Sequence, residues 1–140
     1  MQFNAYLNFN GNCEEAFKFY AQCFNAKIES LFSYQDSPMA EQVPPEWRSK
    51  TMHATLTIGN ATLMGCDTPP GRYQQPTGFS VTIGVTNIPE AERLFHALAE
   101  NGKVEMPIQE TFWSARFGML VDRFGIPWMI NCEQAAQRGA

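Results

Sequence analysis

The sequence predicts an α+β protein built from two tandem β-α-β-β-β modules, and three repeated features support this prediction. A helix motif occurs twice, as GNCEEAFKFY at 11–20 and as TNIPEAERLF at 86–95. An alternating apolar run precedes each motif, and a pair of strand-like runs follows it. A chain of 140 residues is short enough for these halves to form one domain.

Two helices are expected, over residues 12–24 and 87–101, because apolar residues recur there at helical spacing. Each begins at an Asn that is followed three residues later by a Glu. This is the spacing of a capping box, in which the Asn side chain accepts an amide hydrogen bond and the Glu reaches back. The two pairs are Asn12 with Glu15 and Asn87 with Glu90. Asn101-Gly102 is a typical helix end.

The strands follow the same repeat. The alternating runs at 3–9 and 78–85 predict the first strand of each module, and AKIE (26–29) and GKVE (102–105) follow the helices. Two hairpins are predicted, at 53–66 with a two-residue Gly-Asn turn and at 117–132 with a four-residue turn that ends in Gly. The predicted boundaries are 1–66 for the first module, 67–76 for a linker rich in Pro and Gly, and 76–132 for the second module, within a single domain of residues 1–140.

The Gly-Asn turn predicts which residues share a face of the first hairpin. One face is small and apolar, and it suits a helix packed against it. Its cross-strand pairs are Ile58–Ala61, Leu56–Leu63 and Ala54–Gly65. The other face carries His53, Thr55, Thr57, Thr62, Met64 and Cys66. In the second module, Phe79, Val81, Ile83 and Val85 are expected on the apolar face, with Ser80, Thr82 and Gly84 opposite. We expect the two mixed faces to line a shared cleft that suits a small, partly apolar molecule.

Composition limits the function. Apolar residues make up 44% and charged residues 17%, and the net charge of −4 with no basic run argues against a nucleic-acid partner. No apolar stretch reaches the roughly 18 residues of a membrane span, and the N-terminus has no secretory pattern. We therefore expect a cytoplasmic protein with no membrane partner. Its four cysteines have no CxxC spacing and are expected to be reduced thiols.

The C-terminal segment ETFWSARFG (110–118), with DRFG (122–125) and PWMIN (127–131), carries a resemblance to a known family. Together with GNCEEAFKFY and the paired modules, it resembles the PhnB-like branch of the vicinal oxygen chelate superfamily. That superfamily includes glyoxalase I, extradiol dioxygenases and bleomycin-resistance proteins. The resemblance implies a glyoxalase/bleomycin-resistance-like fold and a homodimer. Members of this branch often carry the label 3-demethylubiquinone-9 3-methyltransferase.

The resemblance also implies where a metal would bind, because metal-using members take one ligand from the first and one from the last strand of each module. Alignment of the repeats places these positions at Ala5, Met64, Ser80 and Met129. None of them is a His or a carboxylate, which hard divalent ions prefer. We therefore expect neither the usual metal site nor another cofactor.

The candidate catalytic residues are His53 and Glu110. His53 could act as a base or a hydrogen-bonding group. Glu110 could act as a base, because desolvation by the neighbouring aromatic rings would raise its affinity for a proton. The candidate ligand-binding residues are Met64, Ser80, Phe112, Trp113, Phe117, Met129 and Asn131. Structural alternatives stay open: His53 as an edge-strand residue, Glu110 as a surface residue or a partner of Arg116, and the aromatic rings as core or dimer packing.

The stretch 33–50 is long and contains three prolines, which favours a lid or a dimer arm anchored by Trp47. Three functions remain open, and whether the protein is an enzyme is left undecided. A binding protein would hold a planar compound without turnover. A glyoxalase-type isomerase or lyase with other ligands would copurify with a metal. A methyltransferase would bind S-adenosylmethionine, although the sequence has no GxGxxG motif for a nucleotide.

Overall fold

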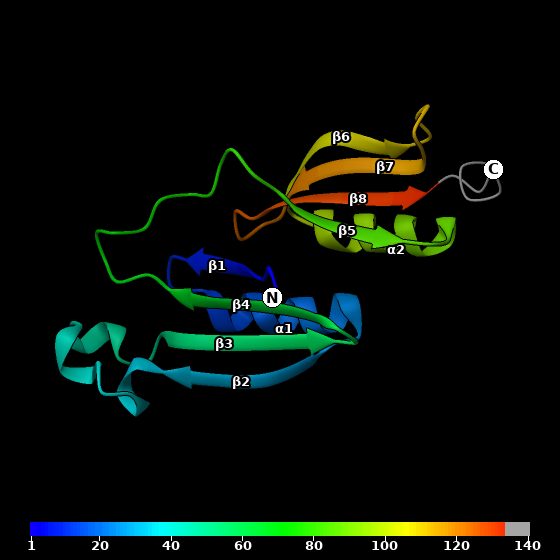
Figure 1. Cartoon of the computed structure of the whole chain (residues 1–140). Helices are drawn as coiled ribbons and strands as arrows, with labels where there is room; N and C mark the ends of the chain where they lie inside the picture. Colours follow the sequence, from blue (N-terminus) through cyan, green and yellow to red (C-terminus); the bar gives the residue numbers. More distant parts are fainter. Residues whose placement is uncertain (134–140) are drawn as a thin grey trace. The chain divides into compact units, whose positions relative to one another are not determined.

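The computed structural model describes residues 1–133 of the chain, which separates into two compact units, Met1–Gln75 and Pro76–Ala140. Each unit holds one four-stranded sheet with one helix packed on it (Figure 1). This arrangement confirms the predicted α+β fold of two β-α-β-β-β modules. Neither helix of residues 1–133 has the length and apolar character needed to cross a membrane.

The sheet of the first unit has the order β1-β4-β3-β2. Its elements are β1 (Ala5–Phe9), α1 (Cys13–Phe24), β2 (Lys27–Ser33), β3 (Thr51–Ile58) and β4 (Ala61–Asp67). β1 is parallel to β4 and the other neighbours are antiparallel, so the sheet is mixed. The Gly-Asn turn forms where it was predicted, with Gly59 at a φ of 55°. The predicted register is confirmed, because Leu56 pairs with Leu63 and Ala54 with Gly65.

The second unit repeats this topology with the order β5-β8-β7-β6. Its elements are β5 (Val81–Val85), α2 (Ile88–Ala99), β6 (Lys103–Gln109), β7 (Ser114–Val121) and β8 (Pro127–Glu133). β5 begins later than predicted, so Phe79 precedes the strand and is exposed rather than part of its apolar face. The turn between β7 and β8 is also longer than predicted, because it includes Ile126.

The core of the first unit lies between α1 and the apolar face of its sheet. Phe17 and Tyr20 of α1 are fully buried against it. Gly65 allows this close approach, because a methyl group there would lie 2.9 Å from the Phe17 ring and 2.8 Å from the Leu7 carbonyl oxygen. The buried residues that strands β1, β3 and β4 contribute are Leu7, Phe9, Ala54, Leu56 and Leu63.

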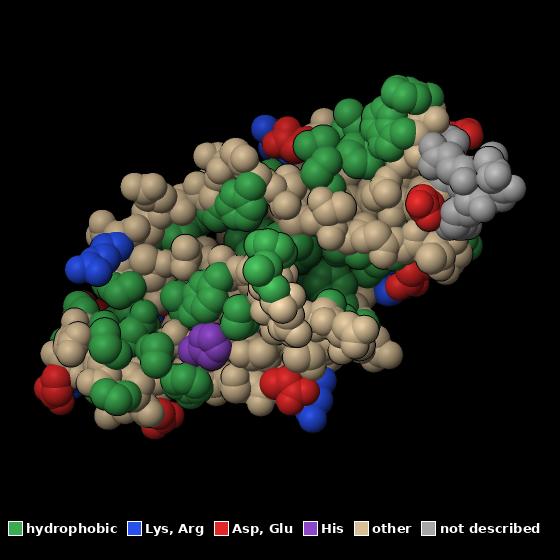
Figure 2. Space-filling view, viewed as in Figure 1, with side chains coloured by type: hydrophobic (Ala, Val, Ile, Leu, Met, Phe, Trp, Pro, Cys, Tyr) green, Lys and Arg blue, Asp and Glu red, His purple; other side chains and the backbone are tan. Residues whose placement is uncertain are grey.

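The core of the second unit is built in the same way. Trp128 of β8 is 1% exposed and is the largest side chain of this core. Gly118 of β7 makes room for Phe95 of α2, since a methyl group there would approach that ring to 2.6 Å. The other buried apolar residues of this core include Ala91, Leu94, Leu98, Leu120 and Ile130. Other hydrophobic side chains stay at the surface of both units (Figure 2).

The segment after β2 is held at both ends. Tyr34 and Gln35 donate backbone hydrogen bonds to the carbonyl oxygens of Lys50 and Arg48, which closes the segment at its base. Between them the chain forms three single-turn 3₁₀ helices. Trp47 lies against Gly11, so the predicted anchor does contact the body of its own unit. Whether the segment serves as a lid or a dimer arm stays a prediction.

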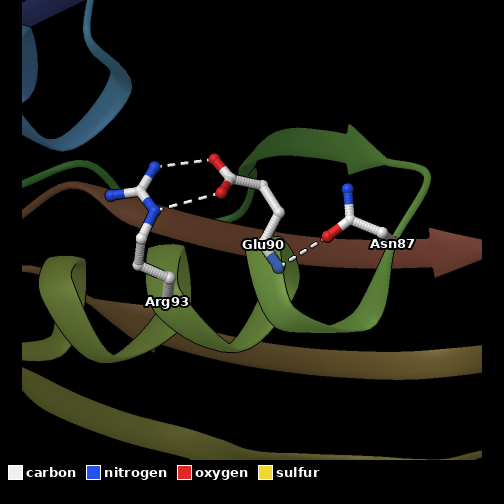
Figure 3. A network of polar contacts seen from close by, with 3 residues as sticks. All are labelled: Asn87, Glu90 and Arg93. Atoms are coloured by element: carbon white, nitrogen blue, oxygen red, sulfur yellow. Dashed lines mark hydrogen bonds and ion pairs between the residues drawn. The ribbon is translucent and has the colours of Figure 1, made fainter.

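The two helix starts differ from the predicted capping boxes. Asn87 accepts a hydrogen bond from the backbone of Glu90 at 2.9 Å, but the Glu90 side chain pairs with Arg93 instead of reaching back (Figure 3). Asn12 makes no side-chain cap. The buried carboxylate of Asp67, at the end of β4, takes over this role for α1. Its Oδ1 accepts from the amides of Gly11 and Cys13, each at 2.9 Å.

Candidate functional site

In the first unit, the sheet face away from α1 carries a row of polar and polarisable side chains. Cross-strand pairing places Tyr6 beside Met64, Met64 beside Thr55, and Thr55 beside Ser30. Residues that pair directly across neighbouring strands project from the same face, so this row runs across the whole sheet. We call it, with His53 and Cys66 in the next row, the Tyr6–His53 face.

His53 is the centre of the contacts on this face. Its Nδ1 lies 3.1 Å from the Tyr6 hydroxyl, and its Nε2 lies 2.9 Å from Oγ1 of Thr55. The rings of Tyr6 and Phe32 flank it at centroid distances of 5.8 and 5.9 Å. His53 is half-buried and both ring nitrogens have partners, so its ring orientation is defined by its neighbours.

Tyr6 and Cys66 are kept neutral by their surroundings. Burial, followed by the proximity of Cys66 and a hydrogen bond to it, raises the pKa of the Tyr6 phenol well above its ordinary value. Burial likewise raises the pKa of the Cys66 thiol, with a smaller opposite effect from its hydrogen bond to Tyr6. The Cys66 thiol donates to Oδ1 of Asn8 at 3.7 Å. Both groups therefore act as hydrogen-bond donors at neutral pH, and Cys66 is not a reactive thiolate.

The corresponding face of the second unit is dominated by methionine. Met106, Met119 and Met129 pair with one another across β6, β7 and β8, and Met129 pairs with Thr82 of β5. The Thr82 hydroxyl donates to Sδ of Met129 at 3.7 Å. Thioether side chains are flexible and polarisable, so they adapt to ligands of different shape. We call this row and the neighbouring Phe117–Asn131 pair the methionine face.

Aromatic rings gather at one end of this unit, where β6 and β7 are joined (Figure 2, upper right). Phe112 is 88% exposed and Trp113 is 41% exposed, and their rings meet edge to face at 4.8 Å. Trp113 in turn meets the buried Phe117 at 5.4 Å. Phe112, Trp113 and Phe117 therefore form one cluster, anchored by Phe117 and exposed at Phe112, and ligand binding by these residues stays a prediction.

The remaining predicted residues fall in different places. Met64, Met129 and Asn131 lie half-buried on the sheet faces away from the helices, and the Ser114 hydroxyl donates to Asn131. Ser80 lies just before β5. Glu110 is exposed in the short loop after β6, and Arg116 pairs with Glu92 at 2.9 Å.

The two predicted catalytic groups belong to different units, and neither unit by itself brings them together. His53 is in β3 of the first unit, and Glu110 is in the second. The sequence interpretation missed Tyr6, which is the nearest titratable partner of His53. The alternation in FNAYLNF held the necessary signal, because Leu7 and Phe9 are buried on the helix side and Tyr6 therefore projects away from it.

The donor groups present do not fit the metal of the metal-using relatives. The first and last strands bring Tyr6 beside Met64 and Thr82 beside Met129, whereas the repeat alignment had placed Ala5 and Ser80 at these positions. A phenol, a hydroxyl and two thioethers are poor ligands for a hard divalent ion. Within residues 1–133, no three His, Cys, Asp or Glu side chains are grouped so that they could hold a metal.

Comparison with known proteins agrees with this architecture. The family model described as 3-demethylubiquinone-9 3-methyltransferase matches residues 1–131. Protein YjdN from Escherichia coli (strain K12) is 34% identical over 139 residues, which cover 94% of this chain and 95% of that protein.

Two solved structures are similar over almost the whole chain. Protein PA1353 from Pseudomonas aeruginosa has a TM-score of 0.88 at 47% identity and covers 96% of this chain and 98% of its own. The PhnB protein from Bacillus cereus has a TM-score of 0.79 at 26% identity, and the match covers 94% of this chain and 99% of the PhnB chain. The chain therefore belongs to the 3-demethylubiquinone-9 3-methyltransferase family, which includes PhnB-like proteins, and it has the two-module glyoxalase-like fold.

Proposed function

We propose that this protein binds a small, partly apolar molecule on the sheet faces that its helices leave uncovered, without the divalent metal of its metal-using relatives. The observation that carries the proposal is the composition of these faces. Each sheet packs one apolar face on a helix, while the other combines thioethers with hydroxyl groups and, in the first unit, an imidazole. Such a mixture of apolar contact area and a few polar groups is typical of small-molecule sites.

The ligand class follows from the charges. The residues that define the Tyr6–His53 face and the methionine face include no Asp, Glu, Lys or Arg. A strongly charged ligand would lose hydration there without gaining an ion pair. Aromatic rings and thioethers instead favour a planar, largely neutral molecule that carries one or two hydrogen-bonding oxygens.

Methyl transfer remains a separate candidate because of the family label. Enzymes that bind S-adenosylmethionine through a nucleotide-type α/β sheet need helices that alternate with parallel strands, whereas each sheet here is mixed and has one helix. Calorimetric titration with S-adenosylmethionine distinguishes the two functions. Saturable binding would support methyl transfer, and a flat titration at millimolar cofactor would leave the binding function.

The methionines give a direct test of ligand binding. Protein labelled with ¹³C at the methionine methyl groups would be titrated with 2-naphthol and 4-nitroanisole and followed by NMR. We expect shifts at Met64, Met119 or Met129, which lie on the proposed faces. Met39, in the 3₁₀ segment, and Met52, which neighbours His53 on β3 but points to the opposite side, serve as internal controls. Shifts confined to the controls, or none at all, would contradict the proposal.

A further inference from the structure

A chain of hydrogen-bonding side chains crosses the Tyr6–His53 face. Thr55 contacts Nε2 of His53, and Nδ1 of His53 contacts the Tyr6 hydroxyl, which lies beside Cys66. Cys66 continues the chain by donating to Asn8. These residues come from three strands, and Tyr6 lies 47 positions from His53 in the sequence. The fold, rather than local sequence, therefore assembles the chain.

The protonation state of the His53 imidazole decides which groups donate and which accept in this hydrogen-bond network. A neutral ring has one N–H donor and one acceptor, so it donates to either Tyr6 or Thr55 and accepts from the other. A protonated ring donates to both. The Tyr6 oxygen then accepts from Nδ1, and its own O–H must point to another acceptor. Protonation of His53 thus makes the Tyr6 hydroxyl available as a donor.

On this basis, and resting on the ligand-binding function proposed above, we propose that His53 and Tyr6 form a proton relay to an oxyanion of the bound molecule. The Tyr6 O–H bond breaks as its proton passes to the ligand oxygen, and the Nδ1 proton of the imidazolium passes to the Tyr6 oxygen. The ligand gains one proton, Tyr6 is restored as a neutral phenol, and His53 becomes neutral with its proton on Nε2, facing Thr55.

The position and chemistry of Tyr6 support its place at the ligand end. Tyr6 is 44% exposed on the edge strand β1, whereas His53 and Thr55 of β3 and Cys66 of β4 are half-buried. Its raised pKa disfavours a free phenolate, so the two proton transfers occur together. The ligand is therefore a partly apolar molecule with a weakly acidic oxygen, such as a phenol or an enol, which arrives as its oxyanion and is neutral once the relay has protonated it.

Few other charges influence His53. Within residues 1–133, β1 presents Tyr6 to it and β4 presents Cys66, while β2 presents the Phe32 ring. The charged groups Lys27 and Glu29 lie further along the sheet, where they pair with each other and with Thr57. The contacts to Tyr6 and Thr55 are therefore the specific determinants of the His53 proton position.

4-Nitrophenol tests the relay, because its absorbance shows whether its oxygen is protonated. The probe would be titrated into the full-length protein at a pH where about half of it is free phenolate. We expect the wild-type protein to bind it with loss of the phenolate band, because the relay moves a proton from the His53 imidazolium through Tyr6 to the probe. In Tyr6→Phe and His53→Gln, the bound probe should keep about tenfold more phenolate, because a charge-assisted hydrogen bond or its proton is lost. His96→Gln, which makes the same substitution at an exposed position of α2, should behave like the wild type.

4-Nitroanisole, which has the same ring but no ionisable oxygen, separates the two proposals. If it fails to bind to the wild type, the ligand-binding function falls and the relay falls with it. If it binds while bound 4-nitrophenol stays a phenolate, or if Tyr6→Phe protonates the probe as the wild type does, the relay alone is overturned.

NMR of the ligand-free protein gives a second test. The ¹⁵N resonances of His53, assigned by comparison with a His96→Gln variant, report which ring nitrogen carries the proton. We expect Tyr6→Phe to change the tautomer balance of His53, since Nδ1 loses its partner. A His53 spectrum that does not respond to Tyr6→Phe would overturn the relay.

Discussion

The two modules share one topology but hold their helices in different ways. In the first, the buried carboxylate of Asp67 accepts hydrogen bonds from the amide of Gly11, just before α1, and from those of Cys13 and Thr51, the first residues of α1 and β3. In the second, the local side chain of Asn87 caps α2. The same duplicated helix motif is therefore capped in two ways. In the first module a carboxylate from a distant strand accepts the free amides, and in the second an Asn three residues away accepts one.

The buried carboxylate of the second module serves a different element. Asp122 accepts from the amides of Phe124 and Ile126, in the turn between β7 and β8, and from Nε1 of Trp128 near the start of β8. Asp67 therefore joins three elements, whereas Asp122 organises one turn and fixes one core indole. This difference predicts that the two carboxylates contribute unequally to stability.

Replacement of Asp67 should have the largest effect on stability. Asp67→Ala removes the acceptor of two buried amides and one part-buried amide, and we expect the free energy of unfolding to fall by about 3–5 kcal/mol. Asp122→Ala should cost about 2–3 kcal/mol, because its donors all lie within six residues of it and the turn can rearrange around the loss. Urea unfolding followed by circular dichroism measures both. Equal losses would show that the long-range cap of α1 has no special role.

Two glycines allow a second comparison. Gly65→Ala should cost about 2–3 kcal/mol, because the added methyl group meets the Leu7 carbonyl oxygen as well as the Phe17 ring. In Gly118→Ala the added methyl group would lie closest to the Phe95 ring. The loss of stability should therefore be smaller in the double variant with Phe95→Leu. The same unfolding measurements apply. Full rescue of Gly65→Ala by Phe17→Leu would contradict the role given to the backbone contact.

The helix caps predict a smaller effect that sharpens the comparison. Asn87→Ala removes a side-chain cap and should destabilise the protein by about 1 kcal/mol. Asn12→Ala removes no such bond and should change stability by less than about 0.5 kcal/mol. The two alanine variants are matched in chemistry and differ only in module. A cost for Asn12→Ala as large as that for Asn87→Ala would mean that the cap of α1 is shared.

The smallest predicted effect is the pH dependence of the Glu90–Arg93 pair. Its hydrogen bonds to Arg93 lower the pKa of Glu90 in the folded state. The stabilisation is therefore complete above the unfolded pKa of about 4.3 and is lost as pH falls through the lower folded value. Because the pair is exposed, we expect only about 0.3 kcal/mol. Urea unfolding at several pH values measures this effect. Arg93→Gln should remove it from the pH dependence of the free energy of unfolding, and an unchanged pH dependence would contradict the role of the pair.

Much of the fold was predictable because it depends on local periodicity. The alternation of the strands, the helical spacing of apolar residues and the Gly-Asn turn predicted both modules and the register of the first hairpin. The place of His53 and Met64 on the face away from α1 followed from the same register. The capping boxes were wrong where a side chain had a better partner elsewhere, as Glu90 has in Arg93.

The sequence by itself determined the duplication, the order of the elements and the faces of the strands, since each of these depends on spacing within about ten residues. Only the tertiary structure decided that Asp67 caps α1 and that Tyr6 contacts His53, because these partners are separated by 54 and 47 positions along the chain. Contacts of that kind depend on strand pairing and side-chain direction together, and several registers satisfy the same alternating pattern until the sheet is assembled.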